Sequence, residues 1–230
     1  MSAIELRPSF CAPIDQVYEA ARLMGRALNA HLEGDRTLAA SLIREADMTE
    51  IGDWIDPIWL GRSDLVKPRK VDSLPPVVPK DLRHKPRHAS AEMRRALIER
   101  DGHHCRFCGI PLVRAEVRKE FTRHYPEAAR WTSAREKDQH RGLQVMWLQY
   151  DHVVVHSRGG ETTMENLVVT CAACNFGRDR FTLEEMWLSD PRTSIRLASW
   201  DGRRVWSGLE EILPEAKRQA QSPTSLFRPQ

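Results

Sequence analysis

Two pairs of cysteines constrain the fold of this chain more than any other feature. Cys105 and Cys108 form the first pair, and Cys171 and Cys174 form the second. A Cys-x-x-Cys spacing lets two thiolates reach one metal ion from a tight turn or a helix start. Two pairs supply four soft ligands, which suit a closed, structural Zn²⁺ site whose binding energy contributes to folding. The alternative is four unrelated buried thiols, and Cys11 is expected to be an ordinary thiol.

The segment around the second pair has the pattern of two strands followed by a helix. Residues 145–152 alternate and are rich in β-forming side chains, which predicts a strand. Residues 156–166 are polar and contain glycine, so they predict a loop, and residues 167–170 predict a second short strand. A helix is expected to begin at Cys171, and Cys174, Asn175 and Arg178 are expected to lie one turn apart on it.

This segment resembles the HNH endonucleases, which have a ββα-metal fold. The resemblance rests on Asp151-His152 at the end of the first strand, Gly159-Gly160, Asn166-Leu167 and the Cys-x-x-Cys-Asn motif at 171–175. It extends from Arg95 to about Phe181, apart from an insert at 112–142. Val155 and Arg178 depart from the family, which commonly has Pro and Lys there. The resemblance implies an α+β, mostly helical fold, in which a zinc-stapled ββα-metal core carries a small helical N-terminal region.

The resemblance also implies a role for each polar residue, and elementary chemistry agrees. His152 is expected to be the general base, because an imidazole titrates near neutral pH. Asp151 and Asn175 offer hard oxygens to a catalytic Mg²⁺ or Mn²⁺ ion, and Asn166 is expected to orient the base. The products implied are 5′-phosphate and 3′-hydroxyl ends. Taken singly, these residues could be an ordinary strand-end histidine, a turn acid, a solvated helix residue and a cap.

Three further side chains are weaker candidates for the same site. Arg158 and Arg178 are expected to contact phosphate, since a guanidinium binds phosphate at least as well as an ammonium group does. For His156, a contact to phosphate or metal and a hydrogen bond within the loop are equally good interpretations. His156 is therefore not assigned as a ligand.

The charge distribution points to a polyanionic partner for most of the chain. The net charge is only +3, but acidic side chains outnumber basic ones in residues 1–61, so the remainder is basic. A basic nuclease region predicts binding to DNA, most simply double-stranded DNA. The acidic N-terminal region favours contact with a protein partner or a second copy. The absence of a long apolar run and of a basic, apolar leader predicts no membrane contact and a cytoplasmic location.

Composition divides the chain into four parts. We expect a helical N-terminal region at 1–61, a basic, proline-rich linker at 62–89, a nuclease domain at 90–220 with its helical insert, and a flexible tail at 221–230. The linker is interpreted as a solvated tether in preference to a DNA-tracking segment. The N-terminal region is either a bundle that needs a partner or a cap on the nuclease. The insert either approaches the substrate or packs against the zinc site.

Helical spacing and capping residues predict the remaining elements. Helices are expected at 13–33, at about 38–46, before Pro57, at 91–100 after the cap Ser90, at 182–188 and at 209–213, with one or two helices in the insert broken near Pro126 and a turn at 200–203. Trp187, Trp200 and Trp206 are expected to build a satellite core.

Together these features predict a metal-dependent DNA endonuclease, for which restriction or phage defence would be a setting. One alternative is a non-catalytic, zinc-folded module that binds nucleic acid. The other is a nuclease effector controlled by a protein partner.

Overall fold

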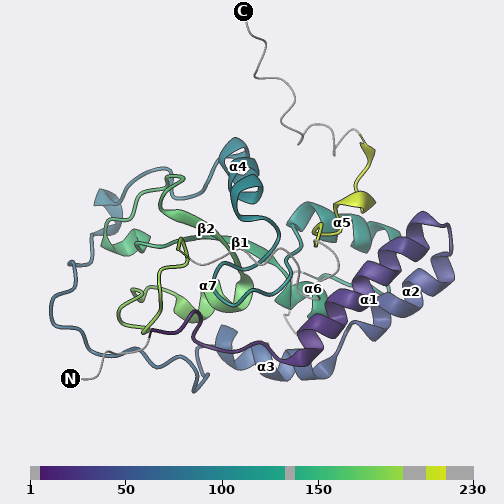
Figure 1. The fold of residues 1–230 in the computed structure, drawn as a ribbon, viewed down its shortest axis with the longest axis horizontal. Coiled ribbons are helices and arrows are strands. Elements are labelled where there is room, and N and C mark those ends of the chain that lie inside the picture. Colours follow the sequence, from purple (N-terminus) through teal and green to yellow (C-terminus); the bar gives the residue numbers. More distant parts are fainter. Residues whose placement is uncertain (1–5, 133–137, 194–205, 216–230) are drawn as a thin grey trace, which may run out of the picture.

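A computed structural model describes residues 6–132, 138–193 and 206–215 of the chain. Helices surround one two-stranded antiparallel sheet, which gives an α+β fold that is mainly helical (Figure 1). The elements are α1 Asp15–Leu32, α2 Arg36–Glu45, α3 Thr49–Trp59, α4 Ala91–Asp101, α5 Ala115–His124, α6 Arg141–Val145, β1 Leu148–His152, β2 Leu167–Cys171 and α7 Ala172–Arg178, with 3-10 turns η1 Lys80–Leu82, η3 His156–Arg158 and η4 Glu210–Ile212. None of the described helices has the length and apolar character needed to cross a membrane.

The N-terminal helices form where the sequence predicts them, with one correction. Helix α1 buries the predicted stripe that includes Val17 and Met24, and Asp35 caps α2 by accepting a hydrogen bond from the amide of Leu38 at 2.9 Å. The prediction that the third helix ends before Pro57 is wrong, because α3 continues to Trp59. Pro57 lacks one backbone N–H donor, and the helix continues for only two residues beyond it.

The three N-terminal helices pack against the second half of the chain. The guanidinium of Arg141 in α6 binds the carboxylate of Asp56 at 2.8 and 3.0 Å. Its amide donates to Asp47 Oδ1 at 2.7 Å, and the fully buried His140 bonds the carbonyl of Ile43 at 2.7 Å. These contacts hold the N-terminal helices against α6 and the residue before it.

A close contact joins the start of the chain to α7. The ring of Phe10 is 3% exposed, and a Cβ placed on Gly177 would lie only 2.1 Å from its Cζ. Glycine at position 177 therefore creates the space that the phenylalanine ring occupies. The N-terminal segment is seated directly on the helix that carries Asn175.

The sheet and α7 form the predicted strand–loop–strand–helix unit, with a shorter first strand. Strand β1 pairs with β2 in antiparallel register, with Leu148 opposite Cys171 and His152 opposite Leu167. The predicted strand at 145–152 is wrong in its first part, because Val145 ends the helix α6. Strand β2 is buried throughout, as expected for a strand covered by α4 and α7.

Hydrogen bonds join the proline-rich segment to the loop after β1, which corrects its interpretation as a solvated tether. The amide of Val78 donates to the carbonyl of Ser157 at 2.8 Å. Two further hydrogen bonds join this segment to the loop after β1, through the carbonyls of His84 at 2.8 Å and of Arg87 at 3.1 Å. Because these acceptors are backbone atoms, the side chains of the segment give no signal of them. Residues 78–87, which we call the strap, therefore form one wall beside the loop.

The insert and the C-terminal part differ from prediction in detail. Helix α5 ends before Pro126, as expected, and Arg114 at its start binds Glu210 with two hydrogen bonds of 2.6 and 2.5 Å. Residues 182–188 make the capping hydrogen bonds of 2.8 and 3.1 Å but form turns, so the helix predicted there is wrong. The helix predicted at 209–213 is only the short 3-10 turn η4.

The three tryptophans expected in a satellite core have different surroundings. Trp206 is buried and donates its indole N–H to the carbonyl of Leu112 at 2.8 Å. Trp187 is half-buried under the guanidinium of Arg69, whose Cζ lies 4.3 Å from the ring centroid. Trp200, the turn at 200–203 and the tail at 221–230 lie outside the described residues.

Candidate metal centre and active-site cleft

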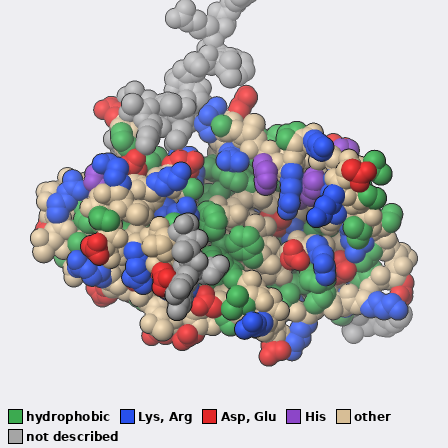
Figure 2. Space-filling view, turned by 180° about the vertical axis from the view of Figure 1, so that it is seen from behind, with side chains coloured by type: hydrophobic (Ala, Val, Ile, Leu, Met, Phe, Trp, Pro, Cys, Tyr) green, Lys and Arg blue, Asp and Glu red, His purple; other side chains and the backbone are tan. Residues whose placement is uncertain are grey.

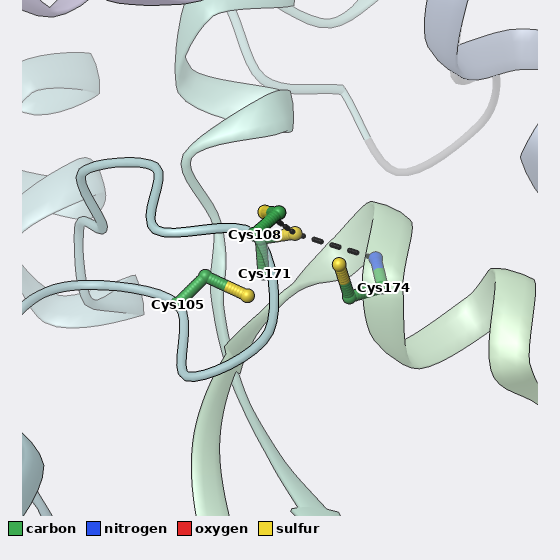
Figure 3. A group of neighbouring side chains, drawn as sticks. All are labelled: Cys105, Cys108, Cys171 and Cys174. Carbon is green, nitrogen blue, oxygen red and sulfur yellow. Dashed lines mark hydrogen bonds between the residues drawn. The ribbon is translucent and has the colours of Figure 1, made fainter. Parts of the chain in front are cut away.

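The four paired cysteines meet at one point. Their sulfur atoms all lie within 4.8 Å of one another, and three of the four residues are buried. Cys105 and Cys108 come from the loop after α4, and Cys171 and Cys174 come from the start of α7 (Figure 3). Four thiolates with no other donor suit a tetrahedral zinc ion with no open position, so this group could hold a structural metal ion.

The same cluster fixes the position of α7. Cys171 is the N-cap of the helix, and its sulfur accepts a hydrogen bond from the amide of Cys174 at 3.3 Å. The sulfur atom of Cys108 lies 3.7 Å from that of Cys171. Asp101 at the end of α4 also accepts from the amide of Val169 in β2 at 3.0 Å. A metal ion held by these thiols would therefore tie α4, the sheet and α7 into one body.

A cleft of about 1070 Å³ lies between β1, α4, α7 and the strap. Its lining includes the three residues predicted to carry the chemistry, Asp151, His152 and Asn175. The side-chain amide of Asn175 lies 3.5 Å from Oε1 of Gln149, so α7 faces β1 at this point. The structure thus brings the predicted base and the two predicted metal ligands to one cavity, whose lining does not include Asn166.

Hydrogen bonds define which nitrogen of His152 carries the proton. Nε2 of His152 lies 2.9 Å from the hydroxyl of Thr162, and this hydroxyl lies 3.1 Å from the carbonyl of Arg87. A hydroxyl has one hydrogen, and a carbonyl can only accept. The threonine can make both hydrogen bonds only if it donates to Arg87 and accepts from an N–H at Nε2, and this arrangement leaves Nδ1 as the basic nitrogen. Thr162 is a residue that sequence reasoning missed, because a threonine in a polar loop has no distinctive signal.

The environment of His152 keeps the imidazole neutral. Burial lowers the pKa of His152 to about 4, and the charges of His156 and Arg178 act in the same direction. A neutral imidazole at neutral pH can accept a proton. His156 is not free to act as a ligand through Nε2, which binds the carbonyl of His84 at 2.8 Å.

Asn166 holds the loop that follows His152. Its Oδ1 accepts from the amide of Val154 at 2.8 Å, and its Nδ2 donates to the carbonyls of Val154 at 3.1 Å and Glu161 at 2.8 Å. The loop passes so closely that a Cβ on Gly160 would lie 1.7 Å from the carbonyl oxygen of Val154. Glycine at position 160 therefore permits the contacts through which Asn166 ties this loop.

Arg178 does not occupy the position expected for a phosphate ligand, which is a correction. It is 1% exposed, and its Nε and Nη2 lie 2.9 and 2.6 Å from Oδ2 of Asp151. Further N–H groups bind the backbone carbonyls of Val153 and Phe181. Burial raises the pKa of Asp151, while the charge and hydrogen bonds of Arg178 act in the opposite direction. The arginine thus orients the carboxylate from behind.

Other basic side chains are better placed to meet a phosphate backbone. Arg158 lines the cleft, but it bonds the carbonyl of Pro75 and lies 3.6 Å from Glu185. Arg87, Arg94 and Arg95 also line the cleft, without an ion pair to any described residue. The two arginines on α4 had a visible signal, since they share the polar side of a predicted helix. Asp179, one turn after Asn175, is a further lining carboxylate that sequence reasoning missed.

Two antiparallel strands and a following helix, with Asp151, His152 and Asn175 at one cleft and a cluster of four cysteines, form a ββα arrangement. Residues 136–178 match the model of the HNH endonuclease family. The chain therefore carries an HNH segment, which includes both strands and α7. A comparison with curated proteins found no match, and a comparison with solved structures found none either.

Proposed function

We propose that this protein is a metal-dependent DNA endonuclease that hydrolyses phosphodiester bonds. The observation that carries the proposal is the contact of the Thr162 hydroxyl with both Nε2 of His152 and the carbonyl of Arg87, which favours a basic Nδ1 at a cleft shared with Asp151 and Asn175. Nδ1 would take the proton of the attacking water. We also infer a cytoplasmic location and products with 5′-phosphate and 3′-hydroxyl ends.

Asp151 and Asn175 are the proposed ligands of the catalytic Mg²⁺ or Mn²⁺ ion. Their oxygens are hard donors of the kind such ions prefer, and they line the same cleft as the base. When bound, the ion would stabilise negative charge on the phosphate and on the leaving oxygen. Arg178 would keep the Asp151 carboxylate ionised and aimed, and Asn166 would hold the loop that carries the base.

The thiol cluster is the proposed structural zinc site. A closed set of four thiolates leaves no position for water or substrate, so its role would be in folding and in the placement of α7. The arginines on α4 would contact the DNA backbone, with Arg158 as a weaker candidate because of its internal partners.

A non-catalytic nucleic-acid reader is the alternative from another class. Such a module would need the zinc site and the basic surface, and it would need neither a neutral, oriented imidazole nor a carboxylate held by a buried arginine. Control by a protein partner, through the acidic N-terminal region, remains compatible with either function and is a separate proposal.

Nicking of supercoiled plasmid tests the proposed function. The purified full-length protein is incubated with plasmid and Mg²⁺ or Mn²⁺, with and without EDTA. We expect nicks that DNA ligase can seal, no reaction in EDTA, and a rate at least about 100-fold lower for His152→Ala. His124→Ala, which changes a half-buried histidine outside the cleft, serves as the matched control. Equal rates for wild type and His152→Ala would overturn the proposal.

A further inference from the structure

Four aromatic side chains form a continuous row whose two middle members line the cleft, and we call it the aromatic row. Trp147 and Phe176 line the cleft together with His152, and their ring centroids are 6.3 Å apart. Trp131 lies 5.8 Å from Trp147, and Trp59 lies 5.4 Å from Phe176. The two middle rings of the row therefore lie in the cleft that also contains the proposed general base, and the two outer rings come from the insert and from α3.

The rings of the aromatic row are partly exposed to solvent, unlike the side chains of a hydrophobic core. Phe176 is 42% exposed, and the three tryptophans are half-buried. The Trp131–Trp147 and Trp59–Phe176 contacts are edge-to-face, with interplanar angles of 82° in both pairs. An edge-to-face contact covers one face of one ring. Partly exposed rings in this arrangement can still present a face to a planar ligand.

A buried positive charge lies against this row. The guanidinium carbon of Arg118 is 3.7 Å from the ring centroid of Trp131 and 5.0 Å from that of Trp147. The residue is 8% exposed, and its Nη1 has no hydrogen-bond partner among the described residues. Burial lowers the pKa of Arg118 to about 10, so the group is charged at neutral pH. A cation against aromatic rings, to which no carboxylate of the described residues is bound, favours an anionic ligand over the row.

Nucleic acid with unpaired bases combines these requirements. Each base offers a planar face that stacks on aromatic rings, and each phosphate offers negative charge. In a duplex the bases are stacked on one another inside the helix, so they cannot reach such rings. Figure 2 shows one face of the molecule with apolar side chains at its centre and basic, acidic and histidine side chains around them.

We infer that the aromatic row binds unpaired bases of DNA next to the phosphate that faces His152. The substrate class is therefore DNA with a single-stranded segment, such as a flap or a bubble. The inference rests on the proposed function for the cleavage step, and the binding step stands without it. Phe176 is the proposed base-stacking residue next to a proposed metal ligand, because it follows Asn175 directly on α7.

Binding measured without chemistry tests the row. Full-length His152→Ala protein is titrated, in the absence of divalent ions, into a fluorescent single-stranded oligothymidylate and into a duplex of equal length. We expect Phe176→Leu to weaken binding of the single strand about ten-fold and binding of the duplex less than two-fold. Phe176→Tyr, which keeps a stacking ring, should bind as the parent does. Trp187→Leu, which removes a half-buried aromatic ring outside the cleft, should also leave both affinities unchanged.

Two outcomes would overturn the inference. One is a single-strand affinity that is the same in Phe176→Leu as in the parent, and the other is an equal loss on both DNAs, which would indicate a general change of the cleft. Cleavage of a flap substrate by proteins with His152 intact then separates the two proposals. If no DNA is cut while Phe176→Leu still loses single-strand binding, the nuclease function fails and the row stands. If DNA is cut and the variants bind single strands equally, only the row fails.

Discussion

Nη2 of Arg178 lies 2.6 Å from Oδ2 of Asp151, and both side chains are buried. Removal of one partner from a buried ion pair leaves the other charge without compensation, which typically costs about 3–5 kcal/mol. We therefore expect Arg178→Leu to lower the free energy of unfolding by about that amount, measured by urea denaturation. Arg180→Leu, at a nearby exposed position, should change it by about 0.5 kcal/mol or less. Equal midpoints for the two variants would contradict a structural role for the pair.

The hydroxyl of Thr162 should matter for the rate and not for the fold. Thr162→Val keeps the shape of the side chain but loses the acceptor for Nε2–H of His152. We expect its nicking rate at saturating Mg²⁺ to fall about ten-fold, which corresponds to about 1.4 kcal/mol in the barrier. Thr162→Ser keeps the hydroxyl and should cut like wild type. If the valine and serine variants cut equally fast, the hydroxyl does not set the tautomer.

The thiol cluster should be essential for folding. Structural zinc sites contribute about 10–16 kcal/mol in small zinc peptides, which is as large as the total stability of a typical domain, about 5–15 kcal/mol. We expect Cys174→Ser to lose zinc and the cooperative thermal transition, as followed by metal analysis and circular dichroism. Cys11→Ala, at a buried cysteine outside the cluster, should keep one zinc ion per chain. Retention of zinc by Cys174→Ser would argue against the site.

Asn175 should control the metal requirement of the reaction. Asn175→Ala removes a proposed oxygen ligand, so the Mg²⁺ concentration for half-maximal nicking should rise about ten-fold or more. Asn175→Asp restores an oxygen at the same place and should recover most of the metal affinity. An unchanged Mg²⁺ dependence in the alanine variant would remove Asn175 from the set of ligands.

Gly177→Ala should destabilise the protein, against the usual helix preference for alanine. A Cβ at this position would lie 2.1 Å from the ring of Phe10, and overpacking of this kind costs about 1–3 kcal/mol. Phe10→Leu/Gly177→Ala should recover part of this loss, because the smaller side chain leaves room. Thermal melts of the single and double variants measure the coupling. Additive effects would show that the two positions do not touch in solution.

Local sequence signals predicted the strand–loop–strand–helix unit, but they did not predict the contacts of the strap or the burial of Arg178. The spacing of the cysteines and the Asp151-His152 pair predict a strand–loop–strand–helix unit, because each signal acts within a few residues. The strap could not be predicted, since its hydrogen bonds use backbone carbonyls such as that of Arg87, whose side chain plays no part. The burial of Arg178 was missed because arginine is usually exposed, and only the fold provides its carboxylate partner.

The aromatic row was missed for a different reason. Trp59, Trp131, Trp147 and Phe176 come from four separate segments, and each alone is an ordinary apolar residue of a helix, a strand or a loop. Only their assembly beside the cleft creates a surface for planar ligands. Such a surface cannot be predicted from the sequence, because its residues follow no regular period or spacing along the chain.

The contact of Phe10 with Gly177 determines how this chain could be shortened or grafted. A protein that is shortened by a cut within the strap would lose the Phe10 ring that packs on Gly177. The apolar surface of α7, which carries Asn175, would then be exposed. The segment that carries Phe10 is thus part of the framework around α7, and the smallest unit that folds on its own should include it.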